Sequence, residues 1–404
     1  MPRLARPGFA LAAALLLAGC GARAQASDPK WVPQPSFTGE AHAPSIVPID
    51  PQHPPASRVP GQRSPGNTSP TPSGSPTTPA EDPAVVAKHL AAPTGLVLLP
   101  DGTALVGERT TGRILQVQPQ PGKPIKIIRT IGGVSTVGGG GLLDLALSPH
   151  YGQDSLIFAY VTTATDNRVV AFTLTGPVTP VLTGIPRGPS DNAGRITFGA
   201  DGDLYIGTGD AGRPADAANL AAESGKVLRV TDIGQPAPNN PSTTSPMFTS
   251  GHRVITGLCV EPNTGDMLEV GPEAQGADVN VLVAGRTYGW PHVSVDDGPS
   301  AATLPAADGA PGSCAVQQNT LYITSLDGHA LLQAPLTVKG TSITVGSFKA
   351  DLVNKYGRLL TVVAAPDGAL WLTTANRDGH GQPIPDDERV LRIVMSGGGA
   401  DAPV

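Results

Sequence analysis

The sequence predicts an all-β protein, a six-bladed β-propeller. The folded part of the 404-residue chain has almost no helical periodicity and many short apolar runs separated by glycine turns. One phrase recurs: an apolar run, a Pro/Asp/Gly turn, and a second run beginning with Leu or Ile. Asp-Gly turns between alternating runs are the strongest local signal for a β-hairpin. The clearest copies are residues 98–106, 198–206 and 365–372.

The spacing of these copies predicts the number of blades. Weaker copies occupy residues 147–157, 260–268 and 317–323, so that the turns begin near 100, 148, 200, 262, 316 and 366. A repeat of about 50 residues with several strands in each copy is typical of propellers. Several repeats also end in a similar alternating strand, at residues 112–117, 167–172, 225–230 and 389–394. Six copies predict six blades, and function is expected in the loops at the mouth of the central channel.

Residues 1–20 have the pattern of a signal peptide. Arg3 and Arg6 precede an uncharged apolar run at 9–18, and small residues lead to Cys20. The apolar run is too short for a spanning helix. The end of the segment resembles the bacterial lipobox, which implies that Cys20 is acylated and becomes the new N-terminus. Several acyl chains would anchor the protein stably to a membrane. An ordinary secretory signal with a chance cysteine is the alternative.

Residues 21–85 are expected to form a disordered tether. They are dominated by Pro, Ser, Thr, Gly and Gln, most clearly at 65–76. Such a composition buries too little apolar surface to offset the entropy of the chain. Residues 86–397 are then the propeller, placed by the anchor at the outer face of the cell membrane.

Charge and cysteine content narrow the function further. The net charge is -6 and 15% of residues are charged, without the basic patch that nucleic-acid binding needs. Besides Cys20 the chain has Cys259 and Cys314. Outside the cytoplasm such a pair favours a disulfide over a metal site, with free thiols as the alternative. The oligomeric state is not predicted by any of these features.

Beyond the repeat, the sequence resembles the glucose/sorbosone dehydrogenase family. Residues 140–149, Gly-Gly-Leu-Leu-Asp-Leu-Ala-Leu-Ser-Pro, look like the family's first-blade phrase, and residues 195–212 are similar to its central phrase. Further phrases follow in the family's order up to about residue 394. A closer resemblance is to mycobacterial-type lipoproteins of this family, which share the lipobox, the proline-rich tether and the propeller.

The resemblance implies a specific chemistry. Enzymes of this family oxidise aldose sugars with pyrroloquinoline quinone, which a calcium ion holds over the propeller mouth. A histidine acts as general base, within hydrogen-bond reach of the sugar. Cationic groups surround the three carboxylates of the cofactor. Gly271 and Pro272 match the pair whose backbone carbonyls bind the calcium; a glycine and a proline at a blade turn without function are the alternative.

The site phrases depart from the family pattern. Asp191 stands where the histidine is expected, in a phrase that ends at Arg195. Arg253 and Arg358 are retained, whereas Asp327 replaces a lysine. The other changed positions are Gly139 for a polar residue, Val254 for an asparagine and Leu360 for an arginine. Asp191, Arg195, Arg253, Asp327 and Arg358 are therefore the candidate site residues, with structural ion pairs as the alternative for the two retained arginines.

The changed charges favour binding without catalysis. Each charge-assisted hydrogen bond is worth about 1.5–3 kcal/mol, so two lost attractions and one added repulsion should lower quinone affinity by orders of magnitude. The first hypothesis is a catalytically degenerate propeller lipoprotein that binds a sugar, another ligand or a partner at the cell envelope. The alternative is an active dehydrogenase that uses quinone, calcium and Asp191 as base. The polar excursion at residues 378–388 is expected to cap the mouth or to lie on its rim.

Overall fold

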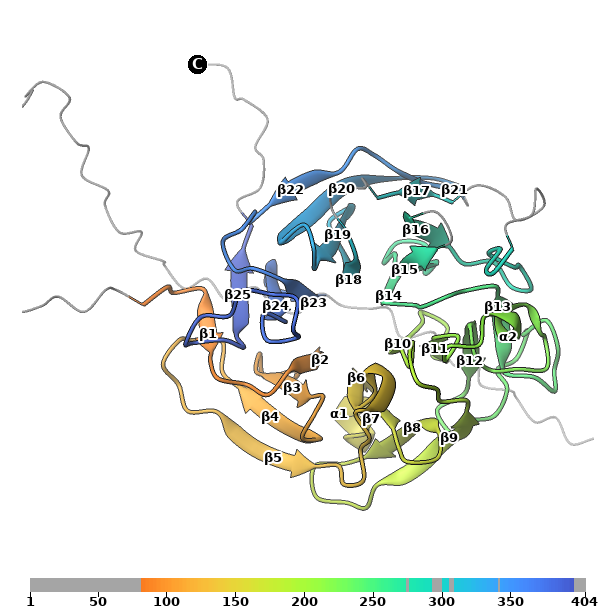
Figure 1. Ribbon diagram of the computed structural model, residues 1–404, viewed down its shortest axis with the longest axis horizontal. Helices are drawn as coiled ribbons and strands as arrows, with labels where there is room; N and C mark the ends of the chain where they lie inside the picture. Colours follow the sequence, from red (N-terminus) through yellow and green to blue (C-terminus); the bar gives the residue numbers. More distant parts are fainter. Residues whose placement is uncertain (1–80, 274–275, 293–299, 305–308, 341, 396–404) are drawn as a thin grey trace, which may run out of the picture. The chain divides into compact units, whose positions relative to one another are not determined.

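Six small antiparallel sheets surround a central axis and form a six-bladed propeller (Figure 1). This computed structural model describes residues 81–395, apart from 274–275, 293–299, 305–308 and 341. The signal peptide, Cys20 and most of the predicted tether lie outside the described residues. Five sheets have four strands and one has five in the described part. The predicted fold class and blade number are confirmed.

The first three blades in chain order have four strands each. Blade one is β2 (Pro93–Leu98), β3 (Ala104–Glu108), β4 (Arg113–Val117) and β5 (Lys126–Thr130). Blade two is β6 (Leu142–Leu147), β7 (Ile157–Thr162), β8 (Asn167–Phe172) and β9 (Thr179–Ile185). Blade three is β10 (Gly194–Phe198), β11 (Leu204–Thr208), β12 (Lys226–Val230) and β13 (Met247–Ser250).

The last three blades complete the ring. Blade four is β14 (Gly257–Val260), β15 (Met267–Glu273), β16 (Gly276–Val281) and β17 (Ala302–Thr303). Blade five is β18 (Pro311–Gln317), β19 (Thr320–Ser325), β20 (Ala330–Lys339), β21 (Ser342–Val345) and β22 (Lys349–Asp351). Blade six is β23 (Leu359–Ala364), β24 (Ala369–Thr374), β25 (Val390–Val394) and β1 (Val85–Ala87). The short helices are η1 (Val137–Gly139), α1 (Tyr151–Asp154) and α2 (Pro214–Ala218).

The ring closes by pairing its two ends. β1 adds to β25 as the outermost strand of blade six, with Val85 opposite Leu391. One sheet thus contains both the first and the last strand, and Pro76–Val404 forms a compact unit by itself. None of the helices among the described residues is long and apolar enough to cross a membrane.

The six predicted turns join the first and second strands of the six blades. In the three Asp-Gly turns the aspartate side chain accepts a hydrogen bond from the backbone N–H two residues later, as between Asp101 and Thr103. Gly102, which follows Asp101, has a φ of 81°. This is the local chemistry that makes Asp and Gly favourable in tight turns.

The phrase at 140–149 lies in the second repeat, in agreement with the order of the predicted turns. This phrase, which resembles the family's first blade, opens blade two, because its strand is β6. The reason is that residues 93–130 already form a complete four-stranded blade ahead of it. Ring closure through β1 then assigns the beginning of the propeller to blade six.

Apolar side chains fill all six interfaces between neighbouring blades. Each interface has its own cluster of buried residues, with Trp371 between blades six and one and Tyr160 between blades two and three. The cluster between blades three and four is the smallest. That interface also holds buried polar side chains, described below.

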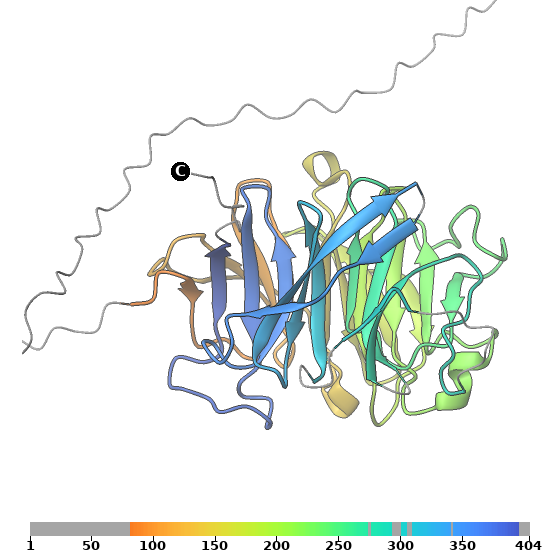
Figure 2. The same ribbon diagram turned by 90° about the horizontal axis from the view of Figure 1, so that it is seen from above.

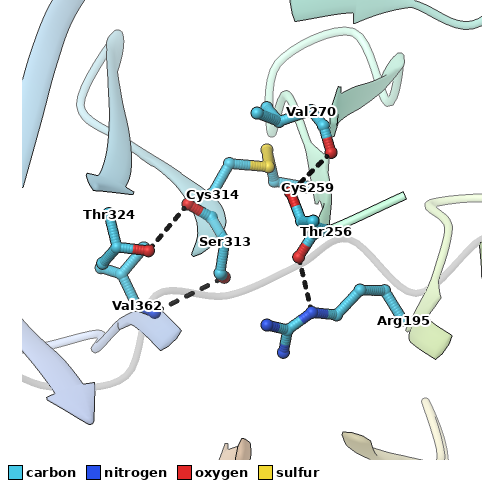
Figure 3. The surroundings of a disulfide bond; sticks show 8 residues. All are labelled: Arg195, Thr256, Cys259, Val270, Ser313, Cys314, Thr324 and Val362. Carbon is cyan, nitrogen blue, oxygen red and sulfur yellow. Dashed lines mark hydrogen bonds between the residues drawn. A yellow bond between two sulfur atoms is a disulfide. The ribbon is translucent and has the colours of Figure 1, made fainter. Parts of the chain in front are cut away.

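The predicted Cys259–Cys314 disulfide is present. It joins β14 to β18, the inner strands of blades four and five, with a Cα–Cα distance of 5.8 Å (Figure 3). Both cysteines are buried. The bridge therefore ties two neighbouring blades together close to the central channel.

Candidate functional site: the mouth of the propeller

A cavity of about 620 Å³ lies at the end of the channel where the inner strands begin. The side view shows α2 and the loop between β24 and β25 projecting from one side of the ring, lower right and lower left in Figure 2. That loop supplies Arg377, Asp378 and Glu388 to the cavity wall. The base of the predicted excursion at 378–388 thus lines the mouth.

Arg195 forms the floor of this cavity. Its guanidinium donates to the carbonyl of Thr256 at 2.6 Å (Figure 3). It donates to the carbonyl of Gly312 at 2.9 Å. It also donates to the hydroxyl of Thr361 at 3.4 Å. Beyond Arg195 a second cavity of about 520 Å³ continues along the channel. Arg195, which was predicted to bind a ligand, is therefore buried between the two cavities. Its guanidinium donates hydrogen bonds to groups of the protein.

The hydrogen bonds around Arg195 connect all six blades. Thr361 of blade six donates to the carbonyl of Thr94 in blade one, at 2.6 Å. Thr94 in turn donates to the carbonyl of Leu142 in blade two, at 2.7 Å. Asp144 of blade two accepts from the backbone of blade three and lies 3.8 Å from Arg195. Burial raises the pKa of Asp144 to about 6, although Arg195 opposes this shift.

Arg358 is held by two carboxylates. Its Nη1 lies 2.6 Å from Asp327 Oδ1 and its Nε lies 2.8 Å from Asp378 Oδ2. The side chain of Arg358 is 6% exposed and that of Asp327 is 56% exposed. Hydrogen bonding to Arg358 holds the pKa of Asp327 below its usual range. The structure thus brings two predicted site residues together as an ion pair.

Arg253 is engaged differently. Its guanidinium lies 5.2 Å from the centre of the Trp290 ring, within cation–π range. The indole N–H of Trp290 donates to Asp210, which fixes the ring. Neither Arg253 nor Trp290 is among the residues that line the mouth cavity. Arg253 was a predicted site residue, but its stacking on Trp290 was not predicted from the sequence.

Asp191 lies beside the mouth and not in its wall. The cavity is lined by the neighbouring Ala193 and Gly194. The Asp191 carboxylate accepts from the hydroxyl of Ser190 at 2.8 Å, and its backbone carbonyl accepts from Ala211. The residue in the histidine position therefore flanks the mouth cavity.

Gly271 and Pro272 lie within β15, opposite Asp278 and Ala277 of β16. β15 ends at Glu273, so both residues lie in the last part of the strand. Neither residue lines the mouth cavity. Among the described residues, no group of three or more His, Cys, Asp or Glu side chains could hold a metal ion.

His252 belongs to a buried polar pair between blades three and four. Its ring stacks on Tyr288 and its Nε2 lies 2.9 Å from Thr249 Oγ1. Its Nδ1 lies 3.7 Å from Glu269 Oε2, and both side chains are fully buried. Burial lowers the pKa of His252 to about 3 and raises that of Glu269 to about 8. Both groups are thus neutral near pH 7.

Arg109 is a mouth residue that the sequence did not reveal. It follows β3 and lines the cavity near Asp378. Its Nη1 donates to the carbonyl of Gly140 at 3.3 Å. A single arginine after a strand carries no distinctive signal, and only closure of the ring brings this one to the mouth.

Comparisons with known proteins agree with the fold. The glucose/sorbosone dehydrogenase family model matches residues 90–315. The PQQ-bound aldose sugar dehydrogenase of Streptomyces coelicolor is 34% identical, with a TM-score of 0.71, over 76% of this chain and 95% of that chain. A putative glucose dehydrogenase of Thermus thermophilus is 37% identical, with a TM-score of 0.70, over 76% of this chain and 98% of that chain. Quinoprotein glucose dehydrogenase B of Acinetobacter calcoaceticus is 30% identical over 53% of each protein, so the chain spans about half of that curated relative.

Proposed function

Because the chain belongs to the glucose/sorbosone dehydrogenase family, we propose that it keeps the propeller of these enzymes as a ligand-binding protein without their chemistry. The observation that carries the proposal is the pairing of Arg358 with Asp327 and Asp378. An arginine already neutralised by two carboxylates has little attraction left for an anionic cofactor.

The other arginines support the same reading. Pyrroloquinoline quinone carries three carboxylates and needs several charge-assisted donors. The donors of Arg195 are used by backbone carbonyls and a hydroxyl. Arg253 stacks on Trp290 outside the cavity wall. Among the described residues of the mouth, the donor set does not fit a tricarboxylate, and we derive no reaction step through the quinone.

The position of Asp191 also argues against turnover. A general base must lie within hydrogen-bond reach of the proton that it removes. Asp191 is absent from the cavity wall and its carboxylate is bonded to Ser190.

An active quinone-dependent aldose dehydrogenase is the second candidate. It is favoured by the 34% identity to the PQQ-bound Streptomyces enzyme, over nearly all of that chain. In this case the Asp327 and Asp378 carboxylates would have to leave Arg358 when the cofactor binds. Calcium would be held by the backbone of Gly271 and Pro272, as the family resemblance implies.

One experiment separates the two candidates. The Pro76–Val404 unit is titrated calorimetrically with pyrroloquinoline quinone and calcium, and aldose oxidation is followed with an artificial electron acceptor. The Streptomyces enzyme serves as the positive control. We expect no binding at cofactor concentrations that saturate the control. Tight binding with turnover that Asp191→Ala abolishes would establish the dehydrogenase instead.

We further propose that acylated Cys20 anchors the protein to the outer face of the cell membrane. The support is the small-residue phrase before Cys20 and the short apolar run ahead of it. Mass spectrometry of the N-terminal peptide should find an acylated cysteine. Cys20→Ala should move the protein out of the membrane fraction; an unchanged membrane fraction would contradict the anchor.

A further inference from the structure

Arg109 and Arg377 both line the mouth cavity without an ion pair among the described residues, but Arg377 donates to the backbone carbonyls of Ile384, Pro385 and Asp387. Arg109 has no ion pair within the part of the chain that the structure describes, and its side chain makes one long hydrogen bond, to Gly140. Burial lowers the pKa of Arg109, and the carboxylate of Asp378 opposes this effect. Asp378 is already bonded to Arg358 and to the backbone of His380.

The backbone holds Arg109 in place between blades one and two. Its N–H donates to Ala92 at 2.9 Å and its carbonyl accepts from Leu142 at 3.0 Å. Gly141 has a φ of 137°, and a Cβ there would lie 2.6 Å from the Cγ of Arg109. Glycine is therefore required for the arginine stem to lie across this turn. A side chain fixed in this way is preorganised to receive a ligand.

The remaining cavity wall is mainly apolar. Five large aliphatic side chains contribute to it: Leu90, Leu143, Ile255, Leu326 and Leu360. A volume of about 620 Å³ suits a small molecule. The aliphatic part of this wall offers no hydrogen-bond partners to the hydroxyl groups of an aldose.

We propose that the mouth binds an apolar molecule with a single anionic group, which pairs with Arg109 while the aliphatic wall surrounds the rest. This inference rests on the proposed binding function and names its ligand class. An anion beside a partly desolvated guanidinium gains more than it would in water. The apolar body gains from leaving water.

The test uses two probes with the same skeleton. 8-Anilinonaphthalene-1-sulfonate is an apolar monoanion, and N-phenyl-1-naphthylamine lacks its sulfonate. Binding to the Pro76–Val404 unit is followed by fluorescence titration. Arg109→Gln should weaken sulfonate binding by about 10- to 100-fold. Arg109→Lys should retain part of the affinity, and both variants should leave the neutral probe unaffected. Arg392→Gln, a surface arginine paired with Asp367, is the matched control.

A second variant separates this inference from the proposed function. Leu326→Trp fills the mouth at a half-exposed position and should block both probes. If it blocks neither, the mouth is not the site and the binding function itself fails. If it blocks both but Arg109→Gln has no effect, the mouth binds ligands and only the anionic class is overturned. Displacement by dodecanoate or dodecyl phosphate, but not by dodecanol, supports the class; the two arms distinguish a carboxylate from a phosphate ligand.

Discussion

Arg358 Nη1 lies 2.6 Å from Asp327 Oδ1, so that the two residues form an ion pair at the propeller mouth. In the sequence Asp327 appears as a lost lysine and a source of repulsion toward an anionic cofactor. In the structure it neutralises the arginine that the family pattern retains. The charge of Arg358 is therefore already balanced within the protein. To attract an anionic cofactor, this guanidinium would have to be free of its carboxylate partners.

This pair predicts unequal effects on stability. Asp327→Asn should destabilise by at most about 1 kcal/mol, because the carboxylate is mostly exposed. Asp378→Asn should lower the free energy of unfolding by more than Asp327→Asn does. The double variant should lower it by more than the sum of the two single effects, because buried Arg358 is then left unpaired. Urea denaturation measures all three. Since the pKa of Asp327 is lowered on folding, its contribution is present above about pH 4 and should be lost in stronger acid. Strict additivity would contradict the shared partner.

Arg195→Leu should destabilise the ring by about 3–5 kcal/mol. The change removes the donor to Thr256 and Gly312 and leaves Asp144 buried without its cation. Chemical denaturation gives the magnitude. Arg392→Leu is the control, since that side chain is part of a surface pair with Asp367 and should cost about 1 kcal/mol or less. Equal losses in the two variants would show that the buried network adds no stability of its own.

Glu269→Gln should change how stability depends on pH. The pKa of Glu269 rises from 4.5 to about 8 on burial, so the folded state holds its proton more tightly than the unfolded state. The contribution of Glu269 to stability therefore falls as pH rises from about 4.5 to 8. Glutamine cannot ionise. The free energy of unfolding of the variant, relative to that of the wild type, should therefore increase from about pH 4.5 to 8 and stay constant outside this range. Unfolding measured at pH 5, 6.5, 8 and 9 tests this, and parallel curves would contradict it.

Removal of the disulfide should loosen the junction of blades four and five. Cys259 and Cys314 are 55 residues apart, and release of a loop of that length costs about 4 kcal/mol in the chain-entropy model. The double variant Cys259→Ala/Cys314→Ala leaves no free thiol in the propeller. Its midpoint of unfolding should match that of the reduced wild type. Reduction without any shift would mean that packing alone holds these blades together.

The propeller repeat could be predicted from the sequence because each turn is formed by residues that are adjacent in the chain. The three Asp-Gly turns carry their own hydrogen-bond chemistry, and the regular spacing of three weaker copies completed the six hairpins without any tertiary information. The Cys259–Cys314 pair was predictable because few cysteines are available to pair.

The site was only partly predictable. Asp327 and Arg358 were identified as altered and retained positions, yet their pairing joins residues 31 apart in the chain. Arg195 was expected to meet a ligand and instead bonds to residues 61, 117 and 166 positions away. Arg109 could not be identified from the sequence. It is a candidate because it lines the mouth cavity without an ion pair among the described residues, and only the folded ring shows this.

The sequence by itself determined the all-β propeller, its six blades and its bridging cysteines, since each follows from local turn chemistry, alternation or composition. Only the tertiary structure decided which charges remain open at the mouth. Neutralisation depends on distances of a few ångströms between side chains from different blades, and ring closure sets those distances. Arg358 is thereby paired with Asp327, while Arg109 keeps its charge facing the cavity.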